Sequence, residues 1–248
     1  MTIRTPRIIA HRGYAARFPE NTLESFSAAI AAGALFVELD VQLSADGVPM
    51  VVHDDSLART ANRPEKIREL DASQLETVDV GYTRRFGEEF PGVLMPRLAQ
   101  VGELAREHPE VTWFVELKRQ SAERFGVDRS VEAVLAEMDF PRAVLISFVE
   151  EAVALASGQG VPVGWAIRKW GRASEETARR LNPDYLFCNH RKLPDRAVLW
   201  QGPWQWAFYE ITEPELASSL ASRGAAFVET MAVAEMIHAL DHWGSRDD

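Results

Sequence analysis

The chain has 248 residues, of which 46% are hydrophobic and 9% aromatic, and its formal net charge at pH 7 is −10. The length suits one α/β barrel or two small domains, and the composition is sufficient for a full hydrophobic core. A net negative charge disfavours nucleic-acid binding, which needs a basic face, and purely electrostatic docking to an anionic membrane. We therefore expect no nucleic-acid partner and no stable membrane insertion.

The single cysteine, Cys188, excludes an internal disulfide and is typical of a reducing compartment. Residues 1–7 include two arginines, and the apolar run that follows stops at His11, which is too short for a signal peptide. No run approaches the about 20 apolar residues of a membrane span. These features predict a cytoplasmic protein, and they leave its oligomeric state open.

Short apolar runs alternate with helical segments along the chain. We expect strands at 7–11, 34–42, 111–117, 142–148, 161–167, 184–188, 204–211 and 225–229. We expect helices near 21–32, 97–108, 128–138, 149–158, 173–181, 213–223 and 232–241. Eight strands in alternation with helices predict an α/β fold of the (β/α)8 TIM barrel type. The alternative is a doubly wound sheet, but no glycine-rich phosphate loop follows the first strand.

Residues 54–95 interrupt this alternation with a polar segment rich in Arg and Glu. We interpret it as a small insertion on the barrel rim, after the second strand region. With no repeat and no linker in the sequence, residues 1–248 are expected to form a single domain. The end of the chain, from about Asp241, is expected to be a frayed tail.

Charged residues lie at alternate positions within two of the expected strands. Glu38, Asp40 and Gln42 share one face of the strand at 34–42, and Glu116 and Lys118 share a face at the end of 111–117. In a barrel these faces point into the mouth, where buried carboxylates are costly unless they are paired or bound to metal. Convergent carboxylates suit a hard divalent cation, Mg²⁺ or Ca²⁺. The alternative is an amphipathic edge strand whose acidic residues face solvent.

Two histidines follow apolar runs near the N-terminus. His11 ends the first expected strand, where barrel enzymes keep their catalytic groups, and His53 follows the run at 50–52. A pair of histidines can serve as general base and general acid near neutral pH. Arg12 and Lys118 supply positive charge suited to a phosphate.

The order of these motifs resembles the glycerophosphodiester phosphodiesterase family, in particular its cytoplasmic bacterial members. The matching motifs are His11-Arg12-Gly13, Pro19-Glu20-Asn21-Thr22, Glu38 with Asp40, Asp46-Gly47, His53-Asp54, Arg59-Thr60, Met95-Pro96-Arg97-Leu98, Glu116-Leu117-Lys118 and Ser147-Phe148. The segment from Leu186 to Val198 also matches, so the resemblance covers nearly the whole chain.

The resemblance implies a TIM barrel and a role for each matching site residue. Three of them, Glu38, Asp40 and Glu116, would hold a divalent metal. An acid–base pair would be formed by His11 and His53, with Arg12 and Lys118 on the phosphate. The implied reaction is metal-dependent hydrolysis of glycerophosphodiesters to glycerol 3-phosphate and an alcohol such as choline or ethanolamine, so the implied partner is a small-molecule phosphodiester. Asn21 and Glu20 would shape the first loop around the site.

The chain departs from the family pattern near its end. An aromatic-Thr-Val-Asn run and a later Thr-Asp pair are replaced by the stretches 209–212 and 229–231, with Thr212 for the asparagine and Met231 for the aspartate. These positions are expected near the alcohol part of the substrate. Glu210 in the first stretch could read a cationic head group, or it could pair with an arginine.

Three alternatives to this function remain. A lysophospholipase D-like activity on single-chain lipids would need an apolar groove at the mouth, to which Trp165, Trp170, Trp200, Trp204 and Trp206 could contribute. A non-catalytic barrel that binds phosphodiesters is disfavoured because no histidine or carboxylate of the motifs is lost. An amidohydrolase-type enzyme is disfavoured because no His-x-His ends the first strand.

Overall fold

The computed structural model describes residues 5–242, and in this part of the chain eight parallel strands close into a barrel. The strands are β1 (Arg7–His11), β2 (Phe36–Leu43), β4 (Thr112–Leu117), β5 (Ala143–Ser147), β6 (Val163–Ile167), β7 (Tyr185–Asn189), β8 (Gln205–Tyr209) and β9 (Phe227–Thr230). Each strand pairs with the next in this order, and β1 pairs with both β2 and β9, which closes the ring. The predicted TIM barrel is confirmed, with each strand within about two residues of its expected limits.

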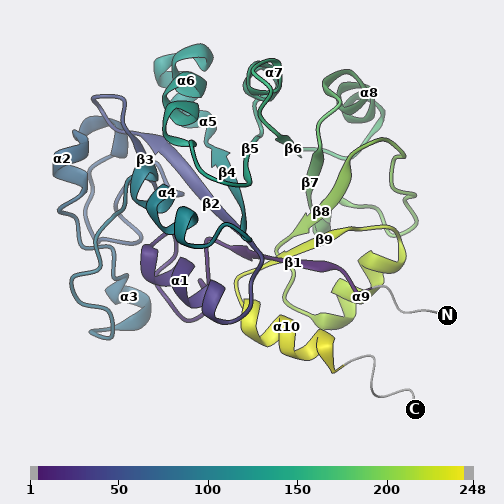
Figure 1. The fold of residues 1–248 in the computed structure, drawn as a ribbon, viewed down its shortest axis with the longest axis horizontal. Helices are drawn as coiled ribbons and strands as arrows, with labels where there is room; N and C mark the ends of the chain where they lie inside the picture. The colour runs from purple at the N-terminus through teal and green to yellow at the C-terminus, as the bar shows by residue number, and fades with distance from the viewer. Residues whose placement is uncertain (1–4, 243–248) are drawn as a thin grey trace.

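Helices surround the barrel (Figure 1). The seven predicted helices are α1 (Leu23–Ala31), α4 (Leu98–Glu107), α6 (Val127–Glu137), α7 (Glu150–Gly158), α8 (Arg172–Leu181), α9 (Pro214–Ser222) and α10 (Val233–Asp241). Further short elements are α2 (Ala72–Leu75), α3 (Thr83–Phe86), α5 (Arg119–Phe125) and the 3₁₀ turns η1 (Ile67–Glu69) and η2 (His190–Lys192). No helix within 5–242 is long and apolar enough to cross a membrane. The tail expected beyond Asp241 falls on 243–248, outside the described residues.

Alternation along the strands separates two cores. The odd-numbered side chains of β2, which are Val37, Leu39 and Val41, are buried against the surrounding helices. Inside the barrel lies a second core of side chains from eight positions: Ile9, Phe114, Val144, Ile146, Ala166, Phe187, Ala207 and Phe227. This inner core fills the lower part of the barrel, so the even-numbered polar residues of β2 open only towards its C-terminal mouth.

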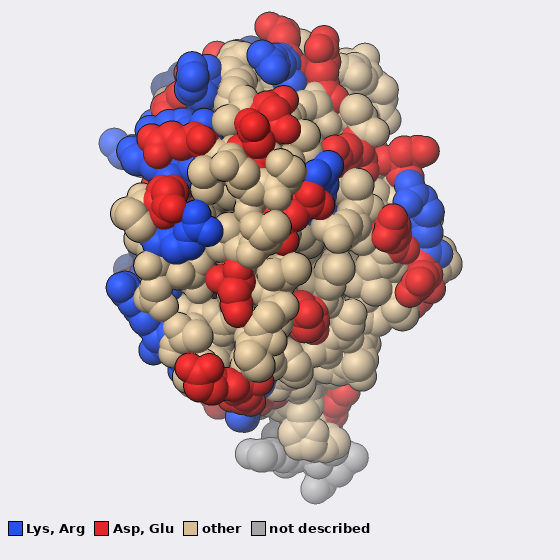
Figure 2. Space-filling model, turned by 90° about the vertical axis from the view of Figure 1, so that its left-hand side faces the viewer, with Lys and Arg blue, Asp and Glu red and all other residues tan. Residues whose placement is uncertain are grey.

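Residues 54–95, the segment predicted as a rim insertion, contribute to a small separate core. The apolar residues Leu57, Ile67, Leu75 and Val78 are buried there with others from the same segment. A short strand that was not predicted, β3 (Pro49–Val51), pairs antiparallel with the end of β2 and leads into the insertion. On the face that carries α2 and α3, acidic and basic side chains are interspersed among uncharged ones (Figure 2).

Candidate active site

The first strand ends in a tight turn at the mouth of the barrel. His11 is the last residue of β1, and its side chain lines the central cavity while only 8% of the residue is exposed. Arg12 and Gly13 follow in left-handed backbone conformations, with φ angles of 57° and 79°. A Cβ atom at Gly13 would lie 2.4 Å from Oγ of Ser25, so glycine permits the close approach of the turn to α1. The turn lets the backbone N–H of Arg12 donate to Oε2 of Glu38 at 3.1 Å.

Three carboxylates converge at the C-terminal ends of β2 and β4. Glu38 and Asp40 project from β2, and Glu116 projects from β4, where it is the register partner of Asp40. One oxygen of each carboxylate lies within 4.8 Å of one from each of the others. Nζ of Lys118 is 3.1 Å from Oδ1 of Asp40 and 2.7 Å from Oε1 of Glu116. Nε of Arg12 lies 3.0 Å from Oδ2 of Asp40, so both predicted phosphate-binding cations border the acidic cluster.

The three carboxyl groups differ in acidity. Burial and the neighbouring Asp40 raise the pKa of Glu38 well above its ordinary value. Burial also raises the pKa of Glu116, against the opposing charge of Lys118. Burial alone would raise the pKa of Asp40, but the positive charges of Lys118 and then Arg12 outweigh it and hold that pKa below its ordinary value. The raised pKa values of Glu38 and Glu116 show that further positive charge would stabilise this cluster.

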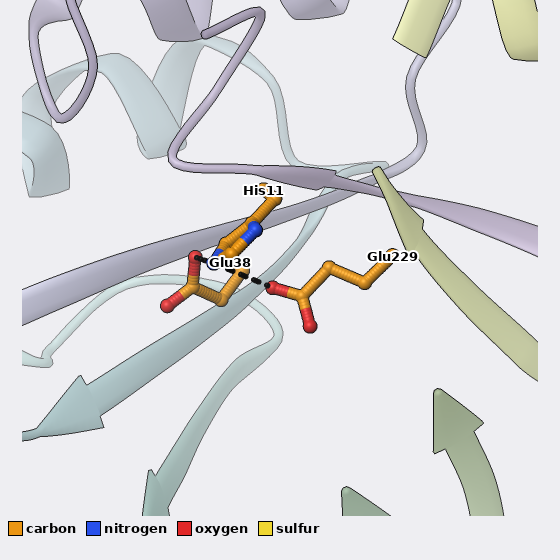
Figure 3. Close-up of side chains that lie close together, drawn as sticks. All are labelled: His11, Glu38 and Glu229. Atoms are coloured by element: carbon orange, nitrogen blue, oxygen red, sulfur yellow. Dashed lines mark ion pairs between the residues drawn. The ribbon is translucent and has the colours of Figure 1, made fainter. Parts of the chain in front are cut away.

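A fourth acidic side chain, Glu229, was not predicted as a site residue. It lies on β9, beside β1, and is buried. Figure 3 shows the carboxylates of Glu38 and Glu229 directed at the ring of His11, whose Nε2 is 3.8 Å and 3.6 Å from them. Burial and the charge of Glu116 raise the pKa of Glu229 to about 8. Alternation could have identified it, because Phe227 fills the barrel interior and the residue two positions on must also point inward.

His11 is held in a form that can accept a proton. Burial, reinforced by the charge of Arg12, lowers the pKa of His11 well below its ordinary value. Its Nδ1 has no hydrogen-bond partner among the described residues. A neutral imidazole of this kind is suited to general-base chemistry.

His53 reaches the same cavity from the segment after β3. Its Nδ1 is 2.7 Å from Oδ1 of Asp54. Arg59 donates from Nε to Oδ2 of Asp54 at 2.7 Å and from Nη1 to Oε2 of Glu20 at 2.6 Å. Glu20 also accepts from Nη1 of Arg12 at 2.9 Å. Alternating charges thus connect His53 to Arg12, and Nε2 remains as the nitrogen of His53 that can act in the cavity.

The amide side chains of Asn21 and Gln42 hold the strand β2 and the loops beside these charged residues in place. Nδ2 of Asn21 donates to Oδ2 of Asp40 at 2.9 Å, and the backbone N–H of Asp40 donates back to Oδ1 of Asn21 at 3.2 Å. Nε2 of Gln42 donates to the carbonyl oxygen of His53 at 2.8 Å. Asn21 holds a left-handed backbone conformation, with φ of 58°, which asparagine tolerates better than most residues. These contacts position the second strand and the second histidine relative to the first loop.

The mouth of the barrel contains a cavity of about 230 Å³. Six of the seven predicted site residues line it: His11, Arg12, Glu38, His53, Glu116 and Lys118. The seventh, Asp40, is 1% exposed and is bonded to the cations of that wall. The apolar part of the lining is Ile146, Phe148, Ala166 and Phe187.

Only some of the residues in the two stretches that depart from the family pattern, 209–212 and 229–231, line this cavity. Both Glu210 and Glu229 line the cavity. Glu210 has a left-handed backbone conformation, with φ of 64°. Oε2 of Glu210 lies 3.9 Å from Nη1 of Arg191, so its charge is partly balanced by an arginine. Thr212 and Met231, which we expected near the substrate alcohol, are not among the residues that line the cavity.

The tryptophans proposed for a lipid groove lie elsewhere. Trp165, Trp200, Trp204 and Trp206 are buried in the core between barrel and helices, and Trp170 packs against that core, with its ring 4.3 Å from that of Trp200. None of the five lines the central cavity of the described chain. The feature on which the lipid alternative depended is therefore absent from the cavity wall.

The carboxylate cluster fits a divalent metal ion. Its donors are carboxylate oxygens from Glu38, Asp40 and Glu116, the ligands that Mg²⁺ and Ca²⁺ prefer. Oε1 of Glu38 is buried and has no hydrogen-bond partner among residues 5–242. A buried carboxylate oxygen without a partner is costly, and a cation bound there would remove the cost.

Known proteins with similar sequences and folds carry related names. The chain is 34% identical over 140 residues to a glycerophosphodiester phosphodiesterase of Caldanaerobacter subterraneus subsp. tengcongensis, an alignment that covers 56% of each chain. It is 33% identical over 141 residues to a glycerophosphodiester phosphodiesterase of Bacillus altitudinis, covering 57% of each. The matched region thus spans little more than half the length of these relatives.

Solved structures match over almost the whole chain. An Oleispira antarctica phosphodiesterase in complex with the product sn-glycerol-3-phosphate has a TM-score of 0.81 and 26% identity, covering 96% of this chain and 97% of that one. A structure from Silicibacter pomeroyi has a TM-score of 0.83 at 23% identity, covering 97% and 95%, and shows the shared fold.

The sequence model of the glycerophosphoryl diester phosphodiesterase family matches residues 11–140. This region runs from His11 through both strands that carry the carboxylate cluster and makes up more than half of the chain. The chain belongs to the glycerophosphoryl diester phosphodiesterase family.

Proposed function

We propose that this protein hydrolyses glycerophosphodiesters to glycerol 3-phosphate and an alcohol, with the help of a divalent metal ion. The observation that carries the proposal is the convergence of three carboxylates, two histidines and two cations around one cavity at the mouth of the barrel. Family membership and the product complex of the Oleispira relative support the same substrate class. The 1–248 chain acts as a single domain in this proposal, with residues 54–95 contributing the loop that carries Arg59.

Glu38, Asp40 and Glu116 would hold the metal, which is Mg²⁺ or Ca²⁺ because the ligands are all oxygens. When bound, such an ion acts as a Lewis acid towards phosphoryl oxygens. Arg12 and Lys118 neutralise the negative charge of the phosphate that develops during the reaction. Since both cations are already held by carboxylates, they are fixed in place before substrate binds.

The two histidines carry the protons in two steps. His11 removes the proton from the glycerol hydroxyl next to the phosphate ester as that oxygen attacks phosphorus, and His53 protonates the oxygen of the departing alcohol. The bond from phosphorus to that oxygen breaks, which leaves a cyclic glycerol phosphate. A water molecule then attacks phosphorus while His53 takes its proton. The bond from phosphorus to the glycerol oxygen that attacked first breaks, and His11 returns its proton to that oxygen. Glycerol 3-phosphate is formed and both histidines regain their initial protonation state.

The proposal is tested by incubating the purified protein with glycerophosphocholine and following the release of glycerol 3-phosphate in a coupled dehydrogenase assay. We expect turnover with Mg²⁺ or Ca²⁺, and a loss of ~10²–10⁴-fold in kcat for His11→Ala. Unchanged turnover in the His11→Ala variant would contradict the assignment.

A further inference from the structure

The catalytic cavity continues into an open hollow of about 380 Å³ on the side of His53. The two spaces share His53, Glu116, Lys118 and Phe148 in their linings. His11 lines the cavity but does not line the hollow. The hollow therefore extends from the histidine that donates a proton to the leaving alcohol.

Three cationic side chains line the outer part of this hollow: Arg119, Arg168 and Lys192. They come from three strands on one side of the barrel, since Arg119 follows β4 by two residues, Arg168 follows β6 directly, and Lys192 ends η2 after β7. Arg168 continues the inward alternation of Ala166, which places its side chain over the mouth. We call this group the basic rim.

Two of the three cations of the basic rim lack an ion-pair partner among the described residues, although Glu123, Glu150 and Glu151 line the next hollow together with Arg119 and Arg168. Nη1 of Arg119 is 3.1 Å from Oε1 of Glu123, an exposed pair within one helix turn. The guanidinium of Arg168 lies 5.3 Å from the centre of the Phe148 ring. Within the described part of the chain, neither Arg168 nor Lys192 has a carboxylate in ion-pair contact. A cluster of three cationic side chains contrasts with the net charge of −10 of the whole chain.

The cavity wall beside His11 carries the opposite charge, because Oε1 of Glu229 lies 3.6 Å from Nε2 of His11. Glu210, which follows β8 and also lines the cavity, lies 3.9 Å from Arg191 and is partly balanced by it. In the proposed reaction the glycerol hydroxyl faces His11, and the leaving oxygen faces His53. The substituent on that oxygen must then extend towards the basic rim, where a cationic head group would be repelled and an anionic one attracted.

We propose that the preferred substrate is a glycerophosphodiester whose leaving alcohol carries a second anionic group, a phosphate or a carboxylate. This inference rests on the proposed function and specifies the leaving alcohol. Arg168 and Lys192 bind the second anionic group, with Arg119 at the edge of the hollow. Because these cations are exposed, the preference is sensitive to ionic strength.

Substrates that differ only in a second phosphate test the inference directly. We compare glycerophosphoinositol 4-phosphate with glycerophosphoinositol, and add glycerophosphocholine as the cationic case. At low salt we expect kcat/KM to be about tenfold higher for the phosphorylated inositol than for the neutral one, mostly through KM, and lowest for choline. The preference should decline as salt is raised to 0.5 M.

Paired variants identify the residues responsible. The double variant Arg168→Gln, Lys192→Gln should reduce the preference for the second phosphate to less than about twofold. Arg168→Lys, which keeps the charge, should retain most of the preference. The control is Arg172→Gln, whose side chain pairs with Glu176 on the surface of α8 and lines neither space, and it should leave the preference unchanged.

The outcomes separate this inference from the function on which it rests. Equal kcat/KM for the two inositol substrates, with active protein, would overturn the inference and leave phosphodiesterase activity standing. A preference that survives in the double variant would also overturn it. If no glycerophosphodiester is hydrolysed, the proposed function itself fails, and the inference fails with it.

Discussion

Nδ1 of His53 lies 2.7 Å from Oδ1 of Asp54, and that contact determines which nitrogen of the imidazole can act in the cavity. Asp54 is in turn fixed by Arg59, and these hydrogen bonds outweigh burial and hold the pKa of Asp54 below its ordinary value. The aspartate is therefore ionised and accepts the Nδ1–H of the ring. This arrangement presents Nε2 of His53 to the leaving alcohol.

Asp54→Asn should impair catalysis through the position of His53. We expect a loss of about 10²-fold in kcat, the cost of a misplaced catalytic group, with a small change in KM. Asp55→Asn is the matched control, because the neighbouring Asp55 pairs with Arg68 outside the cavity. Steady-state kinetics of the two variants check the prediction, and equal effects would contradict it.

The two histidines should respond differently to the leaving group. A nitrophenyl phosphodiester has a leaving group acidic enough to depart without a proton. His53→Ala should therefore lose activity towards glycerophosphocholine but retain much more towards the nitrophenyl substrate, whereas His11→Ala should be impaired with both. If His53→Ala is damaged equally with both substrates, His53 is not the proton donor.

Metal binding should be measurable apart from activity. A divalent ion at 100 times its dissociation constant stabilises a protein by about 2.7 kcal/mol, or roughly 5–10 °C in Tm for a chain of this size. Glu38→Ala, Asp40→Ala and Glu116→Ala should each lose most of this shift and most of the activity. Glu107→Ala, at an exposed position on α4, serves as the control and should keep both. A full thermal shift in the three variants would refute the assigned ligands.

Glu229 should make the metal-free protein less stable as pH rises. Burial first, and then the charge of Glu116, raise its pKa from 4.5 to about 8, so the folded state binds a proton that the unfolded state has released. The associated stability is complete below pH 4.5 and is lost as pH rises towards 8, by at most about 1.4 kcal/mol per pH unit.

The Glu229→Gln variant isolates this contribution, because glutamine keeps the shape and cannot ionise. Urea unfolding in excess chelator should show the variant gaining stability relative to the natural chain between pH 5 and 8, and little difference at pH 4.5. A constant difference across that range would show that Glu229 does not titrate in the folded state.

The barrel could be predicted from sequence because its strands and most helices have strong local patterns. Apolar runs such as 142–148, and proline in the first turn of a helix such as the one that begins at Pro214, indicate these elements without distant contacts. Helix α5 could not be predicted in this way, since the residues it buries, Ser121 and Ala122, are too small to give an amphipathic pattern.

The parts of the site that sequence reasoning missed depend on contacts between distant segments. Arg59 and Glu20 are 39 residues apart, and nothing local in either motif indicates that they meet. Alternation along β9 indicates that Glu229 points inward, but it lies more than 200 residues from His11, and its contact with His11 depends on closure of the barrel between β9 and β1. By contrast, the alternation of Glu38 with Asp40 directly indicated a shared face.

In the proposed reaction this chain cleaves glycerophosphodiesters on the leaving-alcohol side of phosphorus and needs a divalent metal to do so. The most direct measurement is a ³¹P NMR time course with glycerophosphoethanolamine, in Mg²⁺, in Ca²⁺ and in excess chelator. We predict that the diester signal is replaced by that of glycerol 3-phosphate with one or both metals, and that it persists in chelator. Formation of phosphoethanolamine instead would show cleavage on the other side of phosphorus, and equal turnover in chelator would show that no divalent metal is needed.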